Sequence, residues 1–99
     1  RIEYVSGITN SHTVIFKPES GSVFQLFAAS VPTLDGASTM ILKLDDGSNQ
    51  IVVDTHNSTS EPFELNEPIF VSNEVWLIAR TSDASGGNAI VGAAFVRVR

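Results

Sequence analysis

The sequence contains no cysteine among its 99 residues. Disulfide bonds, thiolate metal sites and cysteine nucleophiles are therefore excluded, and only two histidines remain for imidazole chemistry. The stability of the fold has to come from the packing of side chains. Because a chain without cysteine is compatible with a reducing or an oxidising compartment, this absence does not decide where the protein works.

Charged residues are scarce, and most of them are acidic. They make up 17% of the chain, against about 25% in ordinary soluble domains. Six basic and eleven acidic residues give a formal net charge of −5, which repels a phosphate backbone, so we expect no nucleic-acid partner. Two explanations of the low charge stay open: part of the surface is covered, or the many Ser, Thr and Asn residues make it polar enough.

Long apolar runs are also missing. The longest, residues 89–96, falls far short of the roughly 20 residues of a membrane-spanning helix, so we expect no membrane span. No stretch holds apolar residues at helical spacing for the roughly 10 to 12 positions that a helix needs. Because no linker, repeat or low-complexity segment divides the chain, we predict a single domain over residues 1–99.

Strand signals are present along the whole chain. Residues 39–45 place Met40, Leu42 and Leu44 on one face and polar residues on the other, as in a half-buried strand. The following Asp46-Gly47 pair favours a tight hairpin. Further strands are predicted at residues 2–5, 13–17, 22–30, 50–54, 68–71, 74–81 and 89–98, with a weaker candidate at 61–65. About eight short antiparallel strands indicate an all-β, two-sheet sandwich that is jelly-roll-like, with an immunoglobulin-like topology as the alternative.

Two of the predicted strands, residues 74–79 and 90–98, are apolar at both alternating sets of positions. An antiparallel sheet commonly leaves one face to water, so a second apolar face needs a cover. Loops of the same chain or another subunit would provide it, and the sequence leaves both open. If the cover is a subunit, we predict an interface lined by Trp76, Ile78, Val91, Ala93 and Phe95.

Candidate residues for chemistry form no convincing site. Asp54 and His56, with Ser58 or Ser60, have the residue types of a hydrolytic triad, but neighbouring positions in one loop do not make its geometry. Residues 45–49 offer oxygen ligands, yet a hairpin turn explains them better than a calcium loop. We therefore predict that the protein is not an enzyme and has no catalytic residue, metal, cofactor or small-molecule substrate.

Exposed aromatic residues would support a different function. Trp76 and Phe70 could together form a platform that stacks against the apolar face of a sugar. A carbohydrate-binding or host-surface-binding β-sandwich module is therefore the alternative function.

Three segments, residues 21–30, 38–44 and 68–77, resemble the small β-sandwich decoration or cement proteins of tailed bacteriophages. The shared pattern is a first strand, an Asp-Gly hairpin, and a late segment of proline, apolar, turn and apolar residues that leads into an aromatic-bearing strand. The resemblance implies a virion protein on the capsid surface, often a homotrimer, which contacts the major capsid protein and braces neighbouring capsid subunits. It carries no catalytic or ligand-binding motif, and no functional residue is transferred from it.

Overall fold

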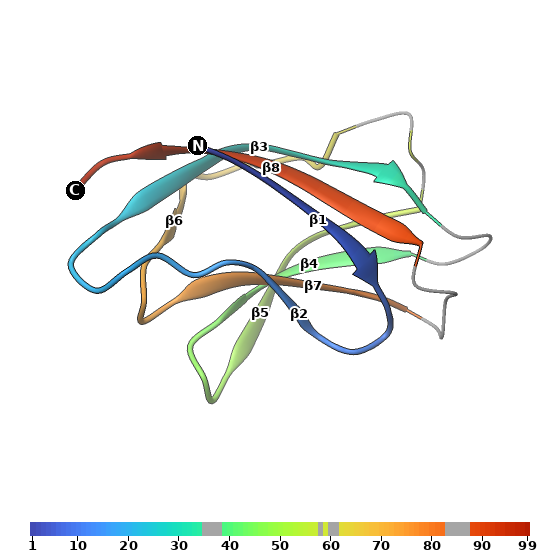
Figure 1. Cartoon of the computed structure of the whole chain (residues 1–99), viewed down its shortest axis with the longest axis horizontal. Coiled ribbons are helices and arrows are strands. Elements are labelled where there is room, and N and C mark those ends of the chain that lie inside the picture. The colour runs from blue at the N-terminus through green and yellow to red at the C-terminus, as the bar shows by residue number, and fades with distance from the viewer. Residues whose placement is uncertain (35–38, 58, 60–61, 83–87) are drawn as a thin grey trace.

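Alternating hydrophobicity produces a fold made of strands (Figure 1). The computed structural model describes residues 1–34, 39–57, 59, 62–82 and 88–99, and this part of the chain contains no helix that is long and apolar enough to cross a membrane. Its strands are β1 (Ile2–Ile8), β2 (Thr13–Phe16), β3 (Phe24–Thr33), β4 (Met40–Asp45), β5 (Gln50–His56), β6 (Ile69–Val71), β7 (Trp76–Thr81) and β8 (Ala89–Arg97). The predicted all-β class with about eight strands is confirmed.

The strands form two antiparallel four-stranded sheets that pack together. The first sheet has the order β1-β8-β3-β6 and the second has the order β2-β7-β4-β5. In Figure 1, β1, β3 and β8 of the first sheet run above β4 and β7 of the second. The pairs β1 with β8, β2 with β7, β3 with β6 and β4 with β5 are those of a hairpin rolled up into two sheets, which is the jelly-roll arrangement. The topology is therefore the predicted jelly roll and not the immunoglobulin-like alternative.

Three strands run further than the sequence predicted, and one of them, β5, ends at His56 instead of residue 54. β1 continues past residue 5 to Ile8 through a register shift that contains Gly7, whose φ of 71° suits glycine. β3 continues to Thr33 because Pro32 lies within an irregularity in its pairing with β8, where a missing N–H costs no ladder hydrogen bond. The weaker candidate at 61–65 is not a strand over residues 62–65, and residue 61 lies outside the described part.

The turn between β4 and β5 is the predicted Asp-Gly hairpin. Gly47 has a φ of 92°, and Asp46 N–H donates to the Asn49 carbonyl at 3.1 Å. The Asp46 carboxylate accepts the N–H groups of Ser48 and Asn49, and these bonds hold its pKa below the ordinary value. The Asp46 oxygens, which were weighed above as calcium ligands, thus accept the hydrogen bonds that close the turn.

The hydrophobic core lies between the two sheets. β8 shows the alternation most clearly, because Val91, Ala93 and Phe95 are buried whereas the residues between them are not. The Phe95 ring packs 4.7 Å from that of Phe16, measured between ring centroids. Burying a side chain of this size contributes about 1.5–3 kcal/mol to folding. Three of the five predicted interface residues therefore belong to the interior of a single chain.

Candidate interaction surface

The outer face of the first sheet carries uncharged residues in three cross-strand rows. Residues directly opposite each other in a sheet share a face, and the register sets these rows as Ile2–Ala94–Ala28, Tyr4–Gly92–Ser30 and Val96–Gln25–Phe70. We call these nine residues the apolar face. It contains no Asp, Glu, Lys or Arg, in a chain with a net charge of −5.

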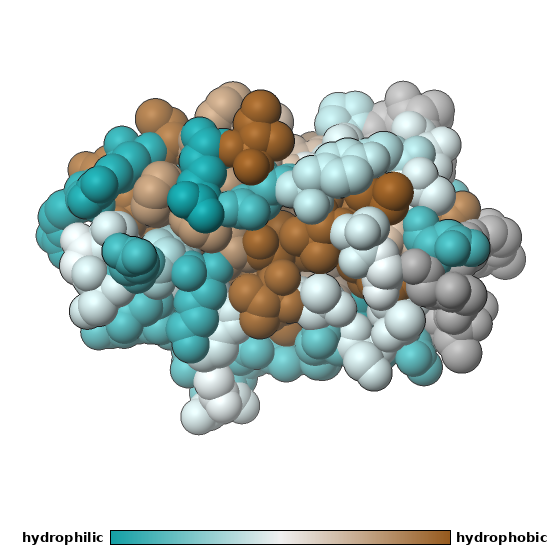
Figure 2. Space-filling view, viewed as in Figure 1, coloured by the Kyte–Doolittle hydropathy of each residue, from teal (hydrophilic) through white to brown (hydrophobic). Residues whose placement is uncertain are grey.

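The large side chains of the apolar face are open to solvent. Ile2 is 78% exposed, Tyr4 63%, Phe70 49% and Val96 48%. In Figure 2, brown apolar residues lie at several points along the upper margin, on the side of the first sheet, with teal residues between them, and a further brown group lies in the middle of the view. Single exposed apolar residues are ordinary, but a contiguous group of them is typical of a surface that contacts another molecule.

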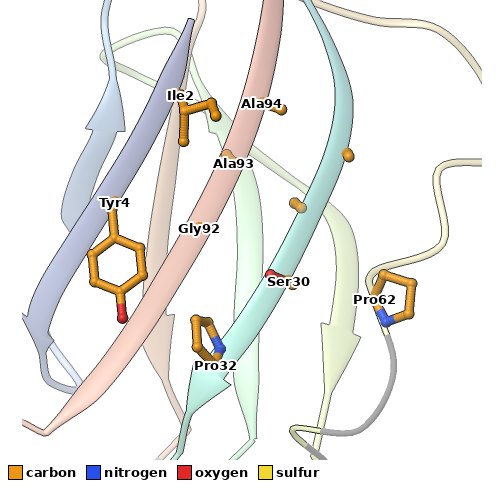
Figure 3. Close-up of a pocket in the computed structure, with 10 residues that line it drawn as sticks. Ile2, Tyr4, Ser30, Pro32, Pro62, Gly92, Ala93 and Ala94 are labelled. Atoms are coloured by element: carbon orange, nitrogen blue, oxygen red, sulfur yellow. The ribbon is translucent and has the colours of Figure 1, made fainter.

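The apolar face contains a shallow depression beside a ridge (Figure 3). Ile2 and Tyr4 on β1 form the ridge, and small residues of β8 and β3 form the floor. Pro32 on β3 lies at one end of the depression, and Pro62 lies on the side away from β1 (Figure 3). The depression has a volume of about 320 Å³. The small floor residues are Ala28, Ser30, Gly92 and Ala94.

Gly92 keeps the depression open although its backbone does not require glycine. A Cβ placed on Gly92 would lie 3.7 Å from both Ser30 Oγ and Tyr4 Cδ2, which is ordinary van der Waals contact, and its φ is not positive. Since the side-chain hydroxyls of Ser30 and Tyr4 are the polar groups of this floor and ridge, the depression offers no converging set of groups to orient a polar small molecule. Its chemistry suits an apolar protein surface.

The edge of β1 is protected against pairing with a further strand, although the outward side chains of β1 are exposed to solvent. Glu3 pairs with Ala93, an inward-facing residue of β8, so its carboxylate points toward the gap between the sheets. Arg1 Nε donates to Glu3 Oε1 at 2.6 Å, and the Arg1 guanidinium lies 4.6 Å from the centre of the Phe16 ring. A charge turned inward on an edge strand discourages the addition of another strand.

At the centre of the outer face of the second sheet, lysine side chains of the same chain lie against the apolar residues, whereas Val14 and Val52 at its margins are 50% and 53% exposed. Lys17 Nζ lies 3.8 Å from the centre of the Trp76 ring. Ile78 is outside the core cluster yet only 1% exposed, because Val14 of β2 and Lys43 of β4 pair with it from both sides. The methylene stem of a lysine covers apolar surface while its ammonium group stays in water.

A polar cluster adjoins this covered region. Lys43 Nζ lies 3.3 Å from His12 Nε2 and 3.3 Å from Gln50 Oε1. Burial, followed by the positive charges of Lys43 and Arg80, lowers the pKa of His12 below its ordinary value of 6.5. His12 is therefore neutral at pH 7 and can accept a hydrogen bond from Lys43.

The structure does not bring the five predicted interface residues together. Val91, Ala93 and Phe95 lie in the core, whereas Trp76 and Ile78 lie on the outer face of the second sheet. The buried side chains of Ile78, Val91, Ala93 and Phe95 offer no surface to a partner, so the interface prediction is corrected for these four. Trp76 is partly exposed, and its part in an interface stays a prediction. The missed residues are the opposite set of β8 together with Ile2 and Tyr4. The sequence contained a signal for Ile2 and Tyr4, because a strand over residues 2–5 places these two side chains on the same face.

The candidate catalytic and sugar-binding sets are not assembled either. The Asp54 carboxylate accepts the N–H of Glu64 at 2.9 Å, and the His56 ring packs 5.7 Å from that of Phe63. Ser58 and Ser60 lie outside the described residues. Among the residues that the structure describes, no group of three or more His, Cys, Asp or Glu side chains could hold a metal ion.

The proposed sugar platform is also wrong. Trp76 belongs to β7 of the second sheet and Phe70 to β6 of the first, so their rings do not share a face. The Lys17 ammonium already lies against the Trp76 ring.

Comparisons of the chain with models of protein families, with curated proteins and with solved structures found no match. The apolar face is thus the feature of the molecule from which its function has to be argued.

Proposed function

We propose that this chain is a non-enzymatic structural protein of a virus particle, a capsid decoration or cement protein that self-associates and braces capsid subunits. The observation that carries the proposal is the apolar face, which is uncharged, contiguous and exposed. Hydrophobic burial contributes about 25 cal/mol per Å² of apolar surface removed from water, so such a face gains from being covered. In a protein that assembles, a neighbouring subunit covers this face.

The low charge and the acidic balance of the chain support the same function. An uncharged face can approach a protein surface without removing ions from water, which is expensive. Many copies on one shell would add modest individual contacts into a strong total attachment. The net charge of −5 keeps the remaining surface away from the nucleic acid of the particle.

The sequence resemblance supplies the biological setting of the proposal. It implies the capsid surface as the location, the major capsid protein as the partner, and three copies in each assembly. The carbohydrate-binding alternative is less well supported, because Trp76 lies under Lys17 and apart from Phe70.

Virus particles purified from the source of the sequence test this function. An antibody against the chain should label the capsid surface in electron micrographs, and particles stripped of the protein should lose their genome at a lower temperature than intact particles. Adding back the chain should restore the original temperature. If the protein is absent from purified particles, the proposed function is wrong.

A further inference from the structure

We propose that the apolar face binds the same face of a second copy of this chain about a two-fold axis. Ile2 and Tyr4 of each copy would insert into the depression of the other. The inference rests on the self-association in the proposed function and changes its copy number from the three that the resemblance implies to two.

The shape of the face carries this inference. A ridge on β1 and a depression over β8 and β3 lie side by side on one surface (Figure 3). A two-fold contact needs a surface that complements itself, so that each element meets its counterpart twice. A ridge next to a depression meets this requirement, because a half-turn about an axis between them places each ridge over the other copy's depression.

The charge of the molecule also favours a second copy as the partner. Two chains that each carry a net charge of −5 repel one another in most orientations. Acidic side chains such as Asp46, Glu64 and Glu67 are exposed elsewhere on the surface. The apolar face carries no charge, so two copies meet there without placing like charges together. A strongly charged partner would find no complementary group on this face.

The size of the face sets the strength of the contact. The strands β1, β8, β3 and β6 hold 7, 9, 10 and 3 residues, and each residue of a sheet covers about 16 Å², from a rise of about 3.3 Å and a strand spacing of about 4.8 Å. The face therefore offers about 460 Å² per copy, or about 900 Å² in total, which is in the range of weak and transient interfaces. We expect a dimer that dissociates at micromolar concentrations.

The two sheets would meet face to face rather than edge to edge. The inward-pointing Glu3 with its Arg1 partner protects the edge of β1. Small residues at Ala28, Gly92 and Ala94 allow a second sheet to approach to the packing distance of about 10 Å.

Sedimentation equilibrium of the whole chain, from about 1 µM to 1 mM, tests the inference with a matched pair of variants. Ile2→Glu places a carboxylate in the proposed contact and should raise the dimer dissociation constant at least about tenfold. Ile51→Glu is the control, since Ile51 is also an edge-strand isoleucine and is 68% exposed, against 78% for Ile2. It should leave the dissociation constant unchanged. Both side chains are largely exposed, so both variants should fold.

A second variant distinguishes insertion of Ile2 and Tyr4 into the depression from non-specific hydrophobic association of the two faces. Gly92→Leu fills the depression and makes the face more apolar. A Cβ at Gly92 would make ordinary van der Waals contacts with Ser30 and Tyr4, and the φ of Gly92 is not positive, so the substitution does not strain the backbone. If Ile2 and Tyr4 insert there, Gly92→Leu should weaken the dimer about tenfold, because the added side chain occupies the space that they need. If only apolar area mattered, the same variant would strengthen it.

A dimer weakened by Ile2→Glu and Gly92→Leu, but not by Ile51→Glu, supports the inference. A trimer, or an assembly insensitive to Ile2→Glu, overturns the two-fold contact while self-association survives. A dimer strengthened or unaffected by Gly92→Leu overturns the insertion of the ridge. A monomer throughout the concentration range overturns both the inference and the self-association on which it rests, whereas attachment to particles is decided separately by the labelling of virions.

Discussion

The two outer faces of this sandwich deal with exposed apolar residues in different ways. On the second sheet, Lys17 lies over Trp76, and Lys43 flanks Ile78. On the first sheet, the neighbours of Ile2 and Tyr4 are Ala94 and Gly92, which are too small to cover anything.

The comparison shows that a long neighbouring side chain can shield an apolar residue at the centre of a sheet, as at Trp76 and Ile78, although Val52 at the edge stays 53% exposed beside Lys43. A lysine stem on the adjacent strand shields such a residue within the chain. Alanine and glycine leave it open and lower the surface beside it, which creates a place for another molecule. The centre of the second sheet is therefore shielded within the chain and only Val14 and Val52 at its margins stay about half exposed, whereas the first sheet leaves Ile2 and Tyr4 more open than either.

The largest expected effect is a loss of stability that shows which side of β8 faces the core. Phe95→Ala should lower the free energy of unfolding by about 3–5 kcal/mol, because it opens a cavity beside Phe16. Val96→Ala, one residue further on and pointing outward, should cost less than about 1 kcal/mol. Urea denaturation of both variants makes the measurement. Equal losses would mean that the inner and outer sides of β8 are assigned wrongly, and the comparison of the two faces would fail with them.

A smaller effect sharpens the account of the second sheet. Lys17→Ala removes the cation above Trp76 and should cost about 0.5–1 kcal/mol of stability. The chain has one tryptophan, so its fluorescence reports on this ring alone. Emission should move to longer wavelength as water reaches the indole, and Lys43→Ala, which lies beside Ile78 instead, should leave it nearly unchanged. An unaltered emission in Lys17→Ala would show that the lysine does not cover the ring.

The smallest effect is the titration of His12 at the margin of the same sheet. Its pKa should be below 6.5 by NMR, because burial and then Lys43 and Arg80 disfavour the imidazolium. Lys43→Met should raise the pKa part of the way back, since burial is the larger cause. The unfolded chain binds this proton more readily than the folded one, so stability is full above pH 6.5 and falls as the pH drops from there to the lowered pKa. A His12 pKa at or above 6.5 would contradict this arrangement.

The sequence predicted the fold more accurately than the surface. Period-two alternation and the Asp46-Gly47 turn were enough to place eight strands, because these signals are local. Residues 74–79 and 90–98 were recognised as apolar on both sides. The residues that pack against each side of these two segments could not be assigned, because they depend on which strands become neighbours in the sheets.

The error at Phe95 has the same origin. Alternation along β8 defines two sets of residues without saying which set faces the other sheet. Pairing with β1 and β3 decides that Val91, Ala93 and Phe95 point inward. The same pairing brings Ile2 beside Ala94, from opposite ends of the chain, and no local pattern contains that contact.

The central claim is that the apolar face of the first sheet is covered when the protein assembles and that the opposite face is not. The chain has one tyrosine and one tryptophan, and they lie on different sheets: Tyr4 on β1 and Trp76 on β7. ¹⁹F NMR of a sample labelled with 3-fluorotyrosine and 5-fluorotryptophan therefore gives one signal for each face. As the concentration rises from micromolar to millimolar, the Tyr4 signal should shift while the Trp76 signal stays constant. A Tyr4 signal that does not move, or a Trp76 signal that moves with it, would contradict the claim.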